Sequence, residues 1–130
     1  MHVSEPAFRI EYQREGELLR AHVTGVNCSL ETTLDYWTAM AAEVRRLAPA
    51  ALLVVDDMEG EPPPPEQLEL FVHAMVGMGF EGIRVAYVEG HASQIAQVEV
   101  GEILARERGF DVRVFGDERA ARLWLRHGMR

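Results

Sequence analysis

The start of the chain shows the alternation of apolar and polar side chains that is typical of β-strands. Residues Phe8–Tyr12 alternate with a period of two, which predicts a half-buried strand. A second strand is expected over Leu18–Gly25, after a short turn around Gly16. The two strands should form an antiparallel hairpin, with the first strand at or near an edge of the sheet.

Beyond the hairpin, helical and strand patterns alternate. Apolar side chains at gaps of three and four predict a helix over Leu30–Leu47, with Ser29 as its N-cap and Pro49 after its end. The remaining strands are expected at residues 52–56, 83–88 and 112–115, and the remaining helices at about residues 65–76, 93–108 and 118–127. The order β-β-α-β-α-β-α-β-α predicts one α/β domain over residues 1–130, with a five-stranded, mixed but mainly parallel sheet and four main helices.

The composition fits that prediction and excludes several kinds of chemistry. The 130 residues are 48% hydrophobic and 26% charged, which is typical of a globular domain with its own core. All 13 residues counted as lysine or arginine are arginine, so Schiff-base chemistry on lysine is excluded. The net charge of −8 argues against binding to nucleic acid. A single cysteine and the lack of a run of about 18 apolar residues predict a cytoplasmic protein that is not inserted in a membrane.

The end of the chain carries a local pattern that goes beyond element order. Val114-Phe115 is followed by the acidic helix cap Asp117, by two alanines and by Trp124-Leu125. Together with the opening hairpin, this ending resembles the SpoIIAA-like (STAS) domains of anti-sigma-factor antagonists and their bacterial relatives. The resemblance implies a SpoIIAA-like fold and a regulatory binding module that is not an enzyme and needs no cofactor.

The chain departs from that family at one functional position. In the antagonists, a phosphorylatable serine follows the central strand at the start of the next helix. Here the corresponding stretch is Asp56–Glu61, followed by Pro62–Pro65, and no serine or threonine occurs between Thr38 and Ser93. The phosphorylation switch therefore has no acceptor at that place, and a partner that docks there must recognise fixed charges and the shape of the prolines.

Candidate binding residues gather after the third and fourth predicted strands, because ligands of open α/β sheets bind at the carboxyl ends of strands. These residues are Asp56, Asp57, Glu59, Glu61, His91 and Ser93. If the two strands are neighbours, four carboxylates and one imidazole share one rim, a ligand set that suits Mg²⁺ or Mn²⁺. The helix start at His91 and Ser93 suits an anion. We interpret the acids as solvated charges and Ser93 as a helix cap, so no metal is predicted.

Three functions fit these residues. We expect docking to a protein partner or to a second copy of the chain, as a homodimer, through the charges of Asp57, Glu59 and Glu61. The alternative is a carrier of a small apolar, lipid-like ligand, with a plastic pocket lined by Met40, Met58, Met75 and Met78. A divalent-metal-dependent enzyme is the weaker alternative. We interpret Cys28 as a small apolar group and His73 as an ordinary helix residue.

Overall fold

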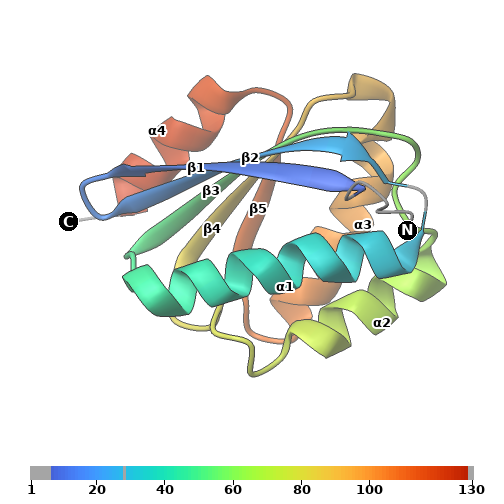
Figure 1. Ribbon diagram of the computed structural model, residues 1–130, viewed down its shortest axis with the longest axis horizontal. Coiled ribbons are helices and arrows are strands. Elements are labelled where there is room, and N and C mark those ends of the chain that lie inside the picture. Colours follow the sequence, from blue (N-terminus) through green and yellow to red (C-terminus); the bar gives the residue numbers. More distant parts are fainter. Residues whose placement is uncertain (1–6, 28, 129–130) are drawn as a thin grey trace, which may run out of the picture.

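The chain forms a five-stranded sheet with helices on both faces (Figure 1). The structure is a computed structural model that describes residues 7–27 and 29–128, so Cys28 lies outside the described residues. The strands are β1 (Phe8–Glu15), β2 (Leu18–Val26), β3 (Ala51–Glu59), β4 (Arg84–Glu89) and β5 (Asp111–Phe115). The helices are α1 (Leu30–Leu47), α2 (Pro65–Met75), α3 (Ile95–Glu107) and α4 (Glu118–Gly128), with a short 3₁₀ turn η1 (Ala92–Gln94) before α3. The predicted order of elements is confirmed.

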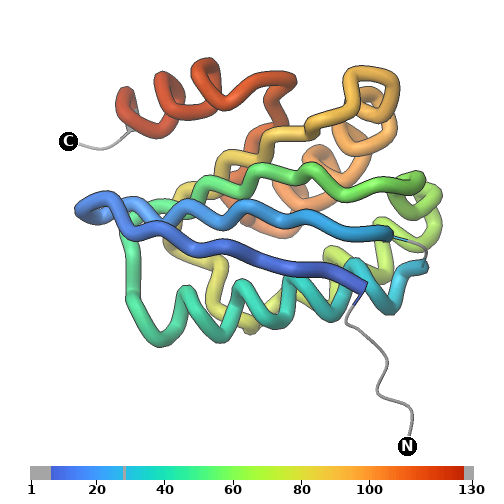
Figure 2. The backbone as a smooth tube through the Cα atoms, turned by 45° about the horizontal axis from the view of Figure 1, so that its top comes forward, coloured from blue at the N-terminus to red at the C-terminus, as the bar shows by residue number. Residues whose placement is uncertain are grey.

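The strands lie in the sheet in the order in which they follow along the chain. β1 pairs with β2 in antiparallel orientation, and β2 to β5 pair in parallel, as predicted. Because crossovers between parallel strands are right-handed and all move the same way here, the connecting helices α1, α2 and α3 cover one face. Figure 2 shows α4 on the other face. No helix in the described part of the chain has the length and apolar character that crossing a membrane requires.

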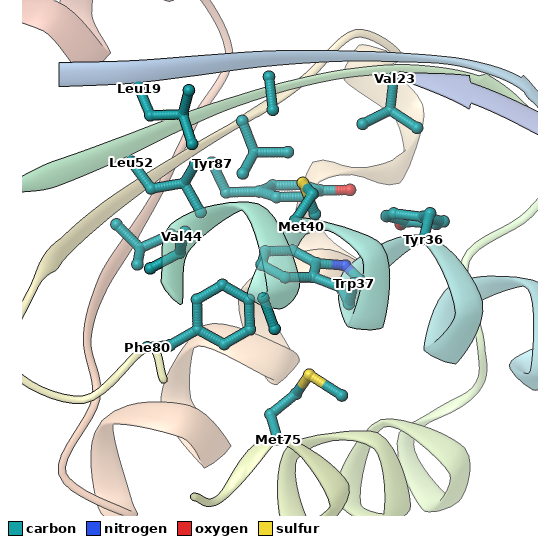
Figure 3. Close-up of a cluster of buried hydrophobic side chains, with 14 of the residues drawn as sticks. Leu19, Val23, Tyr36, Trp37, Met40, Val44, Leu52, Met75, Phe80 and Tyr87 are labelled. Carbon is teal, nitrogen blue, oxygen red and sulfur yellow. The ribbon is translucent and has the colours of Figure 1, made fainter. Parts of the chain in front are cut away.

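Because successive side chains of each strand point to opposite faces, the sheet has a separate hydrophobic core on each face. Leu52 belongs to the larger core under α1, α2 and α3, whereas the next residue, Leu53, belongs to the smaller core under α4. Figure 3 shows part of the larger core, in which Trp37 of α1 lies between the rings of Tyr87 and Phe80. The ring centroids are 5.9 Å and 5.5 Å from that of Trp37, within the range of favourable aromatic pairs.

The central strand is longer than predicted. β3 continues to Glu59, so Met58 and Glu59, which were expected in a loop, pair with the end of β2. The strand stops at Gly60, whose φ is +98° and where a Cβ atom would lie 2.3 Å from the carbonyl oxygen of Asn27. Only glycine fits there. Because Met58 and Glu59 pair with β2, the alternation of the strand fixes the face of the sheet on which each acid of this segment lies.

Two of the three predicted helix caps are found. Ser29 caps α1, because its Oγ accepts a hydrogen bond of 3.2 Å from a backbone N–H in the first turn. Asp117 precedes α4, and its Oδ1 accepts a hydrogen bond of 2.9 Å from the backbone N–H of Ala120. The predicted cap of α3 is wrong: Ser93 lies inside η1, and Gln94 stands at the N-cap position without a side-chain cap bond.

Candidate functional site

A cavity lies between the sheet and the helices α1, α2 and α3. Its volume is about 120 Å³, close to the ~150 Å³ of an engineered cavity that holds a benzene molecule. Most of the lining side chains are apolar, and Trp37, Phe71, Phe80 and Phe110 give the cavity aromatic walls. Apolar walls with a few polar groups are typical of sites for small organic molecules.

The small side chains of α3 explain why this part of the core is not filled. Seven residues of α1 are buried, whereas no residue of α3 is. Helix α3 contributes Gly101 and Ala105 to the cavity lining. A Cβ atom on Gly101 would lie 3.6 Å from the side chain of Leu68 in α2, so the two helices already pack at ordinary contact distance.

Two buried carboxyl groups lie among the polar residues of the cavity lining, which also include Asn27, Thr33, Gln94 and Glu102. Asp56 of β3 and Glu89 of β4 are partners in the register of the two strands, and only 5% and 3% of these residues is exposed. Oδ2 of Asp56 accepts hydrogen bonds from the hydroxyl of Tyr87 and, at 3.4 Å, from that of Tyr36. Each carboxyl also accepts a hydrogen bond from the backbone N–H two residues further along, at 2.8 Å for Asp56 and 3.0 Å for Glu89.

Burial raises the pKa of both carboxyls. For Glu89, burial is the main cause and the Asp56 carboxylate adds to it, which brings the pKa to about 7. Burial also raises the pKa of Asp56, although the hydrogen bond from Tyr87 acts in the opposite direction. The pKa values of Tyr36 and Tyr87 lie well above the usual value of 10, mainly because of burial, so both hydroxyls stay protonated and donate. Near neutral pH the carboxyl of Glu89 therefore gains and loses its proton readily.

Comparison with known proteins identifies the fold. No family model matches the sequence, and no curated protein matches it. A crystal structure from Shewanella loihica PV-4, of an uncharacterized protein of the DUF3478 family with a SpoIIAA-like fold, is similar with a TM-score of 0.56. The match covers 96% of this chain and 98% of that chain. The protein has a SpoIIAA-like fold. The predicted fold class is thus confirmed, and at 15% sequence identity the likeness concerns the fold alone.

Within this SpoIIAA-like fold, strand alternation separates the predicted site residues. Asp56 lines the cavity, whereas Asp57 is half exposed on the opposite face, with Oδ2 at 2.6 Å from Nε2 of His22. Glu59 points to the same side as Asp57; its side chain is 73% exposed and its Oε2 lies 3.9 Å from Nε2 of His91. β3 and β4 are neighbours, which the predicted shared rim of acids required. The prediction that all of these acids are solvated is wrong for Asp56, which is buried.

The remaining predicted residues lie outside the cavity. Glu61 and Ser93 are exposed, and Nε2 of His91 is 3.0 Å from the carbonyl oxygen of Met58. Among the residues that the structure describes, no three histidine, cysteine, aspartate or glutamate side chains converge as a metal site would require. His73, interpreted as an ordinary helix residue, is exposed on α2, and its Nδ1 lies 3.0 Å from the Arg108 guanidinium.

Sequence analysis missed the other polar residues of the cavity. Glu89 follows Tyr87 at a spacing of two, and the alternation of β4 assigns both to the face of the buried Val85. That signal was present in the sequence. Tyr36 gives no comparable signal, because helical periodicity does not reveal that its hydroxyl reaches Asp56, 20 residues further along the chain.

Proposed function

We propose that the protein is a non-catalytic binding module and that its cavity takes up a small, largely apolar organic molecule. The observation that carries the proposal is the cavity itself, about 120 Å³ in volume, with apolar and aromatic walls and one polar part. Of the four methionines predicted for a plastic pocket, Met58 and Met75 line this cavity. Their flexible side chains adapt to the shape of a ligand. The proposal follows the carrier alternative more closely than the docking prediction.

The lining favours binding over catalysis. The described residues around the cavity include no serine, cysteine, histidine, lysine or arginine, so the usual nucleophiles are missing from it, and its general-base candidates apart from the tyrosines are the carboxyls of Asp56, Glu89 and Glu102. Tyr36 and Tyr87 both donate their hydroxyl hydrogens to Asp56. Their raised pKa values make both tyrosines poor general bases near neutral pH.

The proline run supplies part of the cavity wall and the proposed entrance. Pro62 and Pro63 line the cavity, and together with Gly60 they also line a shallow groove on the surface. Two side chains tie this loop to the start of α3. Nε2 of Gln97 donates to the carbonyl oxygens of Pro62 and Pro63 at 2.9 and 3.0 Å, and Nε2 of Gln94 donates to that of Gly60 at 2.7 Å. Because side-chain hydrogen bonds hold this loop, and not the hydrogen bonds of the β-sheet, less free energy is needed to open the loop than to open the sheet.

The test of this proposal is a titration with benzyl alcohol, a neutral probe with one aromatic ring, followed by amide chemical shifts in NMR. We compare the wild-type protein with Gly101→Leu, which places a larger side chain at the cavity, and with Ala96→Leu as the matched control. Ala96 is exposed on the same helix, so both variants add leucine to α3 but only one changes the cavity lining.

We expect saturable shifts for the amides around the cavity in the wild type and in Ala96→Leu, and a loss of at least tenfold in affinity for Gly101→Leu. The helical backbone at Gly101 accepts a side chain without strain, but leucine extends beyond the Cβ position that already contacts Leu68. If Gly101→Leu does not fold, Gly101→Ala, whose Cβ fits at 3.6 Å, is the milder variant. Equal binding by all three proteins, or no saturable shift at millimolar benzyl alcohol in the wild type, would overturn the proposal.

A second candidate function is the predicted docking of a protein partner on the acidic edge formed by Asp57, Glu59 and Glu61. One observation favours it: in the described part of the chain, none of these three half-exposed or exposed acids forms an ion pair with an arginine. Such an edge attracts an arginine-bearing partner. The measurement that tests it is the salt dependence of association with an arginine-rich peptide. Self-association as a homodimer stays a prediction that sedimentation velocity tests.

A further inference from the structure

The charges around the cavity specify the ligand further. Resting on the proposed function, we infer that the bound molecule carries a protonated amine, which Asp56 and Glu89 hold while the aromatic walls enclose its apolar body. The ligand class is thus a small aromatic or alkyl amine and not the fatty acid that a lipid carrier would take.

The placement of the two carboxyls supports a single cationic group. Asp56 and Glu89 are register partners on strands that run side by side, and neighbouring strands are about 4.8 Å apart. Both residues line the cavity and both are almost completely buried. One ammonium group between them can therefore reach both carboxyls.

Every ionisable side chain among the described lining residues is acidic. The ionisable groups of the lining apart from the tyrosines are Asp56, Glu89 and Glu102, and no basic side chain lies among the described lining residues. Glu102 is already engaged, because its Oε2 accepts from the backbone N–H of Val114 and its Oε1 lies 3.9 Å from the Arg106 guanidinium. Burying a carboxylate is costly unless a cation accompanies it, and an anionic ligand would add to that cost. An ammonium ion in the cavity offsets this cost.

The hydrogen-bonding capacity matches as well. In the described chain, Glu89 has one hydrogen bond, at Oε1, and its Oε2 has none. An ammonium group brings three donors and no acceptor, which suits a site that already has two tyrosine hydroxyls donating to Asp56. Trp37 stacks on Tyr87 with an angle of 18° between the rings, Phe71 lies 5.6 Å from Trp37, and all three residues line the cavity. Aromatic faces attract cations in addition to apolar groups.

Binding of an amine should expel the proton of Glu89. The pKa of Glu89 is about 7, and an adjacent ammonium favours the carboxylate, so amine affinity should rise with pH from 6 to 8. The other titratable groups that line the cavity or act on the charge of Glu89 are Asp56, Asp57, His91, Tyr36, Tyr87 and Glu102. Of these, Asp56 and Asp57 raise the pKa of Glu89 and His91 lowers it.

The experiment compares three probes of nearly the same size: benzylamine, benzyl alcohol and benzoate. Calorimetric and NMR titrations are run at pH 8 on the wild type, on Glu89→Gln and on Glu99→Gln. Glu99 is exposed on α3, so its substitution makes the same change of charge and shape away from the cavity. A repeat at pH 6.5 in two buffers of different ionisation enthalpy counts the protons released.

We expect benzylamine to bind at least tenfold more tightly than benzyl alcohol, and benzoate more weakly than both. Glu89→Gln should weaken benzylamine by tenfold or more and change benzyl alcohol by less than threefold, while Glu99→Gln should change neither. Only benzylamine should release a proton at pH 6.5.

The outcomes separate this inference from the proposed function. If benzyl alcohol binds in the cavity as tightly as benzylamine, or if Glu89→Gln leaves benzylamine unaffected, the amine assignment fails and the binding module stands. If benzoate binds best, the assignment also fails, and a carrier of apolar acids is indicated. If none of the three probes shifts the amides around the cavity, both proposals fail.

Discussion

Two groups of carboxyls on opposite faces of the sheet have opposite kinds of partners. On the face of α4, Glu118 accepts hydrogen bonds from the guanidinium groups of Arg20, at 2.9 and 3.0 Å, and of Arg122, at 2.9 Å. Arg122 also bonds both carboxylate oxygens of Glu15 at 3.0 Å. The hydrogen bond from Arg20 is the largest cause that lowers the pKa of Glu118, to about 2. These acids are ordinary partners of arginine.

On the face of α1, α2 and α3, Asp56 and Glu89 are more deeply buried, yet tyrosine hydroxyls and backbone N–H groups are their partners. The chain holds 13 arginines, and some pair with acids on one face, but no arginine within the described ranges 7–27 and 29–128 lines the cavity on the other. Buried acids in a cavity whose pKa values are raised by desolvation are candidates for functional sites. The contrast between these two groups of acids therefore supports the proposal that the cavity is a binding site.

The largest difference between the faces should appear on truncation of their tryptophans. Trp37 is buried and contacts four aromatic rings, so Trp37→Ala should lower the free energy of unfolding by about 3 to 5 kcal/mol. Trp124 of α4 is only partly buried, beneath the Arg84 guanidinium at 4.3 Å, so Trp124→Ala should cost about 1 to 2 kcal/mol. Urea unfolding followed by circular dichroism measures both. Similar losses of unfolding free energy for the two variants would contradict the ranking. If Trp37→Ala does not fold, Trp37→Phe is the milder variant.

The second prediction concerns pH and Glu89. Its pKa is about 7 in the folded protein and near 4.5 in the unfolded chain, so the folded state binds the proton more tightly. This contribution to stability is complete below pH 4.5 and is lost as pH rises through 7, a fall of about 3 kcal/mol. Glu89→Gln keeps the shape without the charge and should remove that fall, which makes it more stable than the wild type at pH 8. The test is the urea midpoint of unfolding between pH 4.5 and 8 for the wild type and Glu89→Gln, with Glu99→Gln as control. Parallel pH profiles of the wild type and Glu89→Gln would contradict the prediction.

Glu118 should show the opposite dependence with a smaller magnitude. Its folded pKa of about 2 lies below the unfolded value of 4.5, so its contribution is present above pH 4.5 and lost as pH falls toward 2. The side chain is 31% exposed and water screens its ion pairs, so we expect Glu118→Gln to cost about 1 to 2 kcal/mol at pH 7. The difference from the wild type should shrink between pH 4.5 and 2. A difference that stays constant in acid would show that Glu118 acts through packing and not through its charge.

The fold was predicted from the sequence more completely than the site. Apolar side chains repeat every two residues in strands and every three to four residues in helices, because each element buries one side. These periods predict the elements, and the hairpin and the parallel order are confirmed. The cavity was not predictable in this way. It depends on how α1, α2 and α3 pack over the sheet around the small residues Gly101 and Ala105, and local patterns do not record that packing.

Asp56 shows why the site residues were only partly understood. With β3 expected to end at Asp56, its carboxylate was interpreted as solvated. The strand in fact continues to Glu59, because β2 offers backbone partners as far as Val26. Alternation through the longer strand turns Asp56 inward and leaves Asp57 half exposed. Tertiary pairing, and not local propensity, thus decided which acid enters the cavity.

The smallest effect on stability is expected at the acidic edge. Combined substitution of Asp57→Asn, Glu59→Gln and Glu61→Gln should change the free energy of unfolding by about 0.5 kcal/mol or less per site, because these side chains are half exposed or exposed. The best-formed contact that is lost is the one of 2.6 Å between Asp57 and His22, and it lies at the surface. If the triple variant unfolds, these acids are structural.

The same variant tests the docking function by association with a hexa-arginine peptide. Exposed charges act mainly on the association rate, and salt screens them within about 10 Å at 0.1 M. The triple variant should therefore bind the peptide more slowly and with a flatter dependence on salt than the wild type. The control neutralises Glu69, Glu99 and Glu107, exposed acids on α2 and α3, and makes the same change of net charge elsewhere. If both triple variants slow association equally, the peptide responds only to net charge, and the acidic edge is not a docking site.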